Sequence, residues 1–101
     1  MIAQEKIHQG TAVDKQNLII KNNENGLDKA FVYDFTNVEV PNDMIDELAL
    51  MYEFVDFKLI KESNILVIYF KNNYQIEIEE RLNFLFQKSK LSNINKELYK
   101  F

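Results

Sequence analysis

Six consecutive apolar residues, 65–70, form the longest apolar run in the chain. A membrane-spanning helix needs about 20 such residues, so this run is far too short to cross a bilayer. Its length suits a β-strand, and both faces of that strand would be apolar. We therefore predict that residues 65–70 form a strand in the centre of a sheet, with other strands beside it.

Other segments of the sequence supply neighbouring strands. Residues 55–59 alternate between apolar and charged side chains, which predicts a half-exposed strand joined to the central one by a turn at 62–64. Residues 30–36 also alternate, with Phe31, Tyr33 and Phe35 on one face. Residues 18–20 are a short strand candidate, and the Asn- and Gly-rich segment 22–26 that follows is typical of a turn.

Apolar residues at helical spacing predict helices between and after these strands. One helix is expected over 43–52, capped by Asn42, and another over 79–88, whereas 74–78 fits a strand or a helix equally well. Residues 93–101 are predicted to form a C-terminal helix, and 1–16 a loose arm or an edge strand. The apolar stripe of the first helix comprises Met44, Ile45, Leu48, Met51 and Tyr52, and that of the second comprises Ile78, Leu82, Leu85 and Phe86.

The whole chain of 101 residues has the length of one domain. We expect a single α+β domain over 1–101, with a mostly antiparallel sheet of about four strands packed by two or three helices.

Composition excludes several kinds of chemistry. The chain has no Cys, one His and two Gly, which excludes thiol catalysis and Cys-type zinc sites and leaves little for a glycine-rich phosphate loop. His8 has no Cys or Ser close to it in sequence. The acidic pairs at 46–47 and 79–80 point about 100° apart on a helix, so neither pair converges on a substrate. We expect no enzyme activity, no catalytic residues, no metal site and no cofactor.

The segment 30–57 is unusually acidic. It holds seven Asp or Glu residues, no Lys or Arg, and six of the thirteen aromatic residues. On the predicted helix over 43–52, Leu50 falls outside the apolar stripe and among the acids, as expected for an exposed interface anchor with a charged rim. We predict that this surface binds a protein partner with a basic surface. Its candidate residues are Glu39, Asp43, Asp46, Glu47, Leu50, Tyr52, Glu53 and Asp56.

A second apolar stripe appears if the helix at 79–88 continues to the C-terminus. It lies opposite the first stripe, so either the helix breaks near 89–92 and the chain folds back, or the stripe meets another chain. In the second case the chain forms a homodimer. The stripe begins at Phe84, and its candidate self-association residues are Leu91, Ile94, Leu98 and Phe101.

Residues 81–101 hold five basic residues and one acidic residue, together with aromatic side chains. Such a mixture suits single-stranded nucleic acid, but a chain with net charge −4 and a single Arg is a poor phosphate binder. The lysines more simply face solvent or balance the acidic middle of the chain.

The function predicted from the sequence is that of a small acidic inhibitor, comparable to immunity proteins, antitoxins and phage-encoded inhibitors. The alternative is an accessory subunit that self-associates through its C-terminus, and nucleic-acid binding is the third hypothesis. The N-terminus has no apolar segment of the secretory kind, so we expect a cytoplasmic protein. The many Asn and Lys residues indicate an AT-rich bacterial, plasmid or phage genome.

Overall fold

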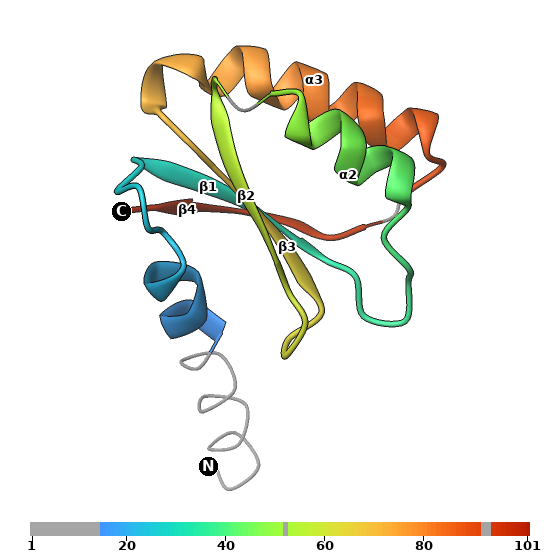
Figure 1. The fold of residues 1–101 in the computed structure, drawn as a ribbon, viewed down its shortest axis with the longest axis horizontal. Helices are drawn as coiled ribbons and strands as arrows, with labels where there is room; N and C mark the ends of the chain where they lie inside the picture. Colours follow the sequence, from blue (N-terminus) through green and yellow to red (C-terminus); the bar gives the residue numbers. More distant parts are fainter. Residues whose placement is uncertain (1–14, 52, 92–93) are drawn as a thin grey trace, which may run out of the picture.

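The computed structural model describes residues 15–51, 53–91 and 94–101. These residues form a four-stranded antiparallel sheet with strand order β2-β3-β1-β4, covered by helices on both faces (Figure 1). In chain order the elements are a helix over 15–21, β1 (Lys29–Asp34), α2 (Asn42–Ala49), β2 (Val55–Ile60), β3 (Ile65–Phe70), the short 3₁₀ helix η1 (Asn72–Tyr74), α3 (Gln75–Lys88) and β4 (Lys96–Lys100).

From β1 to β4 the main elements follow the order β-α-β-β-α-β, the split β-α-β or ferredoxin-like arrangement. Both α2 and α3 lie on one face of the sheet, which we call the inner-helix face (Figure 1). The helix over 15–21 lies on the other face, which we call the N-terminal face. The predicted α+β fold with an antiparallel sheet of about four strands is confirmed.

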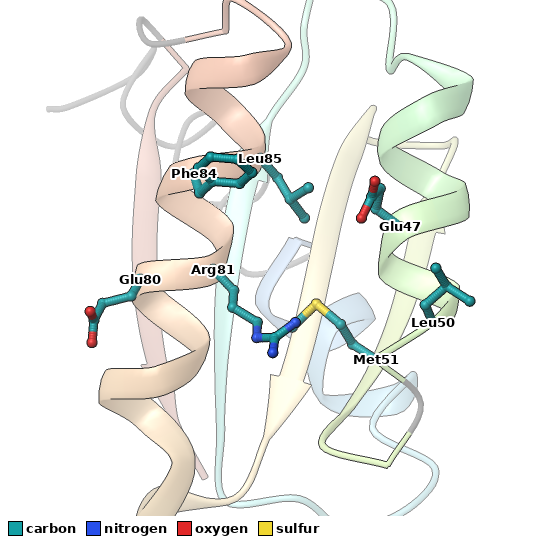
Figure 2. Close-up of a pocket in the computed structure, with 7 residues that line it drawn as sticks. All are labelled: Glu47, Leu50, Met51, Glu80, Arg81, Phe84 and Leu85. Atoms are coloured by element: carbon teal, nitrogen blue, oxygen red, sulfur yellow. The ribbon is translucent and has the colours of Figure 1, made fainter.

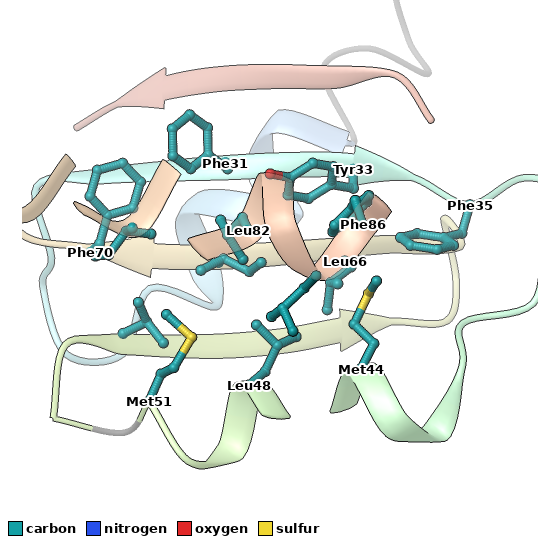
Figure 3. Close-up of a cluster of buried hydrophobic side chains, with 14 residues drawn as sticks. Phe31, Tyr33, Phe35, Met44, Leu48, Met51, Leu66, Phe70, Leu82 and Phe86 are labelled. Carbon is teal, nitrogen blue, oxygen red and sulfur yellow. The ribbon is translucent and has the colours of Figure 1, made fainter. Parts of the chain in front are cut away.

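The main core lies between the sheet and the pair α2 and α3 (Figure 3). The ring of Phe31 stacks on Phe70 with 4.9 Å between centroids, and Tyr33 packs against Phe86 at 4.2 Å. Burial of a large apolar side chain contributes about 1.5–3 kcal/mol, so this cluster strongly stabilises the domain. The stripe predicted for α3 is confirmed, because Ile78, Leu82, Leu85 and Phe86 are all buried.

The central position predicted for residues 65–70 is also confirmed. All six side chains of β3 are buried, and β3 pairs with β2 on one side and β1 on the other. The turn from β2 to β3 uses Asn64 at a φ of 51°, a conformation that Asn tolerates better than most residues. The Asn64 side chain also donates a hydrogen bond to the carbonyl of Phe35.

The strand expected at 18–20 is wrong, because these residues belong to the helix over 15–21. Ile19 is fully buried against the N-terminal face, together with Val32 and Val67. The Tyr69 hydroxyl donates a hydrogen bond of 2.6 Å to the carbonyl of Ile19. That carbonyl lies in the last turn of the helix, where carbonyls have no partner within the helix, so Tyr69 ties the helix end to the sheet.

The helix boundaries differ in detail from the prediction. α2 ends at Ala49, and Asn42 is its first residue, so the predicted Asn42 cap is wrong: the capping position is Pro41, and no side chain caps the helix. The question left open at 74–78 is answered by η1 and by the start of α3 at Gln75. The predicted arm or edge strand lies mostly outside the described residues, although 15 and 16 are helical.

The C-terminal helix predicted over 93–101 is wrong, because residues 96–100 form β4 along the open edge of β1. The ladder is extended at both ends by hydrogen bonds from the amide of Asp34 to the carbonyl of Asn95 and from the amide of Phe101 to the carbonyl of Asp28. α3 ends at Lys88, so the chain folds back near this point. Of the two alternatives predicted for this segment, the break in the helix near 89–92 is therefore the one observed.

Because residues 96–100 form a strand and not a helix, the residues of the predicted self-association stripe do not form one surface. Leu91 and Ile94 pack, partly buried, against the main core. Leu98 is opposite Phe31 and therefore on the inner-helix face, whereas the ring of Phe101 lies 6.0 Å from that of Tyr69 on the N-terminal face. The four residues share no surface on which a second chain could form a helical seam.

Candidate functional site

A groove lies between α2 and α3, on the side of the helices away from the sheet (Figure 2). It has a volume of about 410 Å³. We call it the interhelix groove. It is lined by Glu47, Leu50, Met51, Glu80, Arg81, Phe84 and Leu85.

The interhelix groove has a buried apolar floor and exposed apolar walls. Met51 and Leu85 are almost fully buried and belong to the main core. Leu50, directly after α2, and Phe84, in α3, are 78% and 64% exposed, so two large apolar side chains are open to solvent at the same groove. A binding surface with an apolar centre of this kind is suited to a protein or peptide side chain.

Helical spacing brings these side chains together. Glu47 in α2 and Leu50, which directly follows α2, are three residues apart, and on α3 the same spacing separates Arg81 from Phe84. Residues at this spacing lie on the same side of a helix, and all four of these side chains line the groove. Arg81 extends from α3 toward α2 (Figure 2).

Charged groups surround the apolar centre. The Lys88 ammonium lies 3.4 Å from a carboxylate oxygen of Glu47, which links the two helices across a smaller hollow of about 160 Å³ next to the groove. Both side chains are substantially exposed, so this ion pair contributes at most about 1 kcal/mol. Among the described residues Arg81 forms no ion pair.

The helix layer is the acidic part of the molecule. Residues 39–53 hold five acidic and no basic residues, and α3 holds three acidic and two basic ones. The two segments together carry a net charge of −6, whereas the whole chain carries −4. The remaining residues therefore have a net charge of +2, and the negative charge is concentrated around the interhelix groove.

The structure brings together only part of the predicted binding surface. Leu50 is exposed as predicted, Asp43 and Asp46 are exposed on α2, and Glu47 lines the groove. Glu39 and Glu53 are exposed in the segments before and after α2, and Tyr52 lies outside the described residues.

Asp56 does not belong to this surface. It follows Val55, which faces the main core, and successive side chains of a strand point to opposite faces. Asp56 therefore lies on the N-terminal face of the sheet, where the Asn25 amide donates a hydrogen bond of 3.2 Å to it.

The sequence reasoning missed the contribution of α3 to the site. Phe84 was assigned to a seam with the C-terminal segment, and Arg81 was considered only as a basic residue for nucleic acid. The available signal was that Phe84 falls outside the buried stripe of α3, as Leu50 does on α2. Which sides of the two helices face each other depends on how they pack, which neither sequence pattern contains.

One buried polar group lies outside the interhelix groove. The Tyr33 side chain is almost fully buried, burial raises the pKa of its hydroxyl, and that hydroxyl has no hydrogen-bond partner among the residues described. Among all the residues that the structure describes, no three His, Cys, Asp or Glu side chains are grouped closely enough to hold a metal ion. None of the described helices has the length and apolar character needed to span a membrane. His8 lies outside these residues.

No protein-family model matches the chain, and no curated protein or solved structure is significantly similar to it.

Proposed function

We propose that this protein binds a basic partner protein at the interhelix groove and inhibits it by covering part of its surface. The observation that carries the proposal is that Leu50, at the end of α2, and Phe84, in α3, are both strongly exposed and line the same groove. Exposed large apolar side chains that converge on one hollow are a common sign of a protein-binding site. In this proposal an apolar side chain of the partner lies between Leu50 and Phe84 and contacts the floor formed by Met51 and Leu85.

The distribution of charge supports a basic partner. The net charge of −6 on the segments that form the groove would attract a positive surface and speed the encounter of the two proteins. Exposed acids such as Asp46 and Glu80 add to this long-range attraction, while the apolar centre supplies most of the affinity. Immunity proteins, antitoxins and phage-encoded inhibitors are the classes of protein that act in this way.

Arg81 adds a requirement on the partner. It is the only Arg in the chain, it lines the groove, and it is not engaged in an ion pair with any described residue. A guanidinium group binds a carboxylate through two parallel hydrogen bonds. We expect the partner to place a carboxylate next to its basic residues, opposite Arg81.

Nucleic-acid binding has less support. Ferredoxin-like proteins that bind RNA stack bases on an open face of the sheet. Here that face is covered by the helix over 15–21, and Val32, Val67 and Tyr69 on it are buried. Two lysines of the basic C-terminal segment are also balanced within the chain, because Lys88 pairs with Glu47 and Lys96 with Glu79.

The experiment that tests the proposal is affinity capture from a lysate of a low-GC bacterium on the immobilised protein. Leu50→Gln is compared with the matched control Ile76→Gln, since Leu50 and Ile76 are 78% and 77% exposed but only Leu50 lines the groove. Both variants replace an exposed apolar side chain with a polar one of similar size. Urea unfolding first shows that both are folded.

We expect a protein of net positive charge that is retained by the wild type and by Ile76→Gln and is lost with Leu50→Gln. Equal retention by the two variants would move the binding site away from the groove. Capture of acidic proteins alone would contradict the electrostatic part of the proposal.

A further inference from the structure

The outer edge of β2 is a second surface suited to binding, and it lies on the sheet rather than on the helices. In the described part of the chain β2 pairs only with β3, so the backbone groups along its other side have no strand partner. β2 is the strand nearest the viewer in Figure 1, and no described segment passes in front of it. An open edge of this kind is a template for a further strand.

The side chains of β2 alternate between two kinds. Val55, Phe57 and Leu59 point to the inner-helix face, and Leu59 is 38% exposed. Asp56 and Lys58 point to the N-terminal face, so the strand carries opposite charges at positions two residues apart.

In an antiparallel pair, residues directly opposite each other point to the same face of the sheet. A twofold axis that pairs β2 with a second β2 therefore sets one residue opposite its own copy, and the axis passes midway between the two copies. Three registers near the middle of the strand are available. An axis at Asp56 places two Asp side chains opposite each other, and an axis at Lys58 places two Lys side chains opposite each other. An axis at Phe57 instead sets each Asp56 opposite a Lys58, and each Val55 opposite a Leu59.

From this complementarity we infer that the chain forms a homodimer in which β2 pairs antiparallel with β2 of a second copy, about a twofold axis at Phe57. The two four-stranded sheets become one continuous sheet, and Leu59 is covered. Like charges opposite each other disfavour the two neighbouring registers, so the charges of Asp56 and Lys58 fix the register as well as adding attraction.

The other open edge, β4, lacks this complementarity. The register that pairs all five of its residues with a second β4 sets Lys96 opposite Lys100 at both ends. Like charges directly opposite each other disfavour this pairing of β4, so the occupant we assign to the β2 edge is a second copy that also pairs through β2.

The contacts that Asp56 and Lys58 already make are compatible with this pairing. Asn25 donates a hydrogen bond to Asp56, and Lys58 forms a 2.6 Å ion pair with Glu24. An ammonium has three donors and a carboxylate about four acceptor sites, so each group can hold a further partner. The dimer does not depend on the proposed inhibitory function, because no residue of β2 lines the interhelix groove.

The test is sedimentation equilibrium of the wild type, Asp56→Lys, Lys58→Asp and an equimolar mixture of the two variants, from about 1 µM to about 1 mM. Each variant alone sets like charges opposite each other, so its dimer dissociation constant should rise about tenfold or more. In the mixture the introduced lysine of one chain faces the introduced aspartate of the other, and the native Lys58 faces the native Asp56. A dimer should therefore form again. Thermal unfolding monitors that both variants are folded.

A wild type that remains monomeric up to about 1 mM would overturn the inference, and this result needs no variant. So would a dimer whose dissociation constant is the same in both variants as in the wild type, since it would use another surface. A mixture of folded variants that stays monomeric would contradict the register. Recovery of the dimer only in the mixture would support it, because loss of stability in the separate chains cannot produce such recovery.

Discussion

Two buried tyrosines provide a sharp test of how the fold is held together. The Tyr69 hydroxyl donates a 2.6 Å hydrogen bond to the carbonyl of Ile19, at the end of the helix that covers the N-terminal face. The Tyr33 hydroxyl, also buried, has no partner among the described residues. The change from Tyr to Phe removes one oxygen atom at either position, so the two variants differ mainly in the hydrogen bond.

Tyr69→Phe leaves the Ile19 carbonyl buried without this donor, which costs about 1–3 kcal/mol. For a domain of this size, each 1 kcal/mol corresponds to a change in Tm of about 4–8 °C. In the folded state the Tyr33 hydroxyl is removed from solvent and has no hydrogen-bond partner among the described residues, which costs free energy. We therefore expect the free energy of unfolding of Tyr33→Phe to be unchanged or up to about 1 kcal/mol higher than that of the wild type.

The assay is urea unfolding of the wild type and both variants at pH 7, followed by circular dichroism. Hydrogen exchange of the amides in the helix over 15–21 provides a local readout, because Tyr69→Phe should speed exchange there more than in β3. Equal destabilisation by the two substitutions would refute the reasoning, as would a Tyr69→Phe variant as stable as the wild type.

Three further predictions concern pH, burial and charge. Burial raises the pKa of Tyr69 to about 12, above the value near 10 of an unfolded chain. The folded state therefore holds this proton more tightly, so above about pH 10 Tyr69 alone lowers the free energy of unfolding in urea by up to about 1.4 kcal/mol per pH unit, and the fall should be less steep in Tyr69→Phe. In the same assay Leu48→Ala, in the core, should cost about 2–5 kcal/mol, whereas Leu50→Ala should cost less than about 0.5 kcal/mol because Leu50 is 78% exposed. In stopped-flow binding at low salt, Asp46→Lys should slow association with a basic partner by about two- to tenfold, and Glu62→Lys, on the turn between β2 and β3, should slow it less; equal effects would argue against local steering.

The elements that the sequence predicted well are those whose residues carry a complete local pattern. β3 is apolar on both faces, and the buried stripe of α3 repeats at helical spacing over more than two turns. In both segments the local preference and the final environment agree, so no distant contact was needed to decide them.

The elements that were predicted wrongly depend on distant partners. Residues 18–20 are too short an apolar run to distinguish strand from helix. The helix is stabilised because it buries Ile19 against the apolar side chains on the N-terminal face of the sheet. Residues 96–100 follow both patterns in part, since Ile94, Leu98 and Phe101 have helical spacing while Leu98 and Tyr99 also suit a strand. These residues form a strand because they pair with the open edge of β1. That edge is distant in sequence, so the pattern of residues 96–100 alone could not predict the pairing.

The candidate site was half predictable for the same reason. Leu50 could be recognised because it falls outside the apolar stripe of its own helix. Its position opposite Phe84 depends on the packing of α2 beside α3, which joins residues more than 30 positions apart. The misplacement of Asp56 was avoidable, because the alternation of β2 already puts it on the face opposite Val55.

The interhelix groove is tested most directly by the amide NMR spectrum of the ¹⁵N-labelled protein, recorded as the captured basic partner is added. Binding as proposed predicts that the largest chemical-shift changes fall at residues 46–51 of α2 and its C-terminal turn and at 80–85 of α3, with small changes in β4. Large changes confined to β4 or to the segment 22–28, with the amides around Leu50 and Phe84 unmoved, would contradict the central claim.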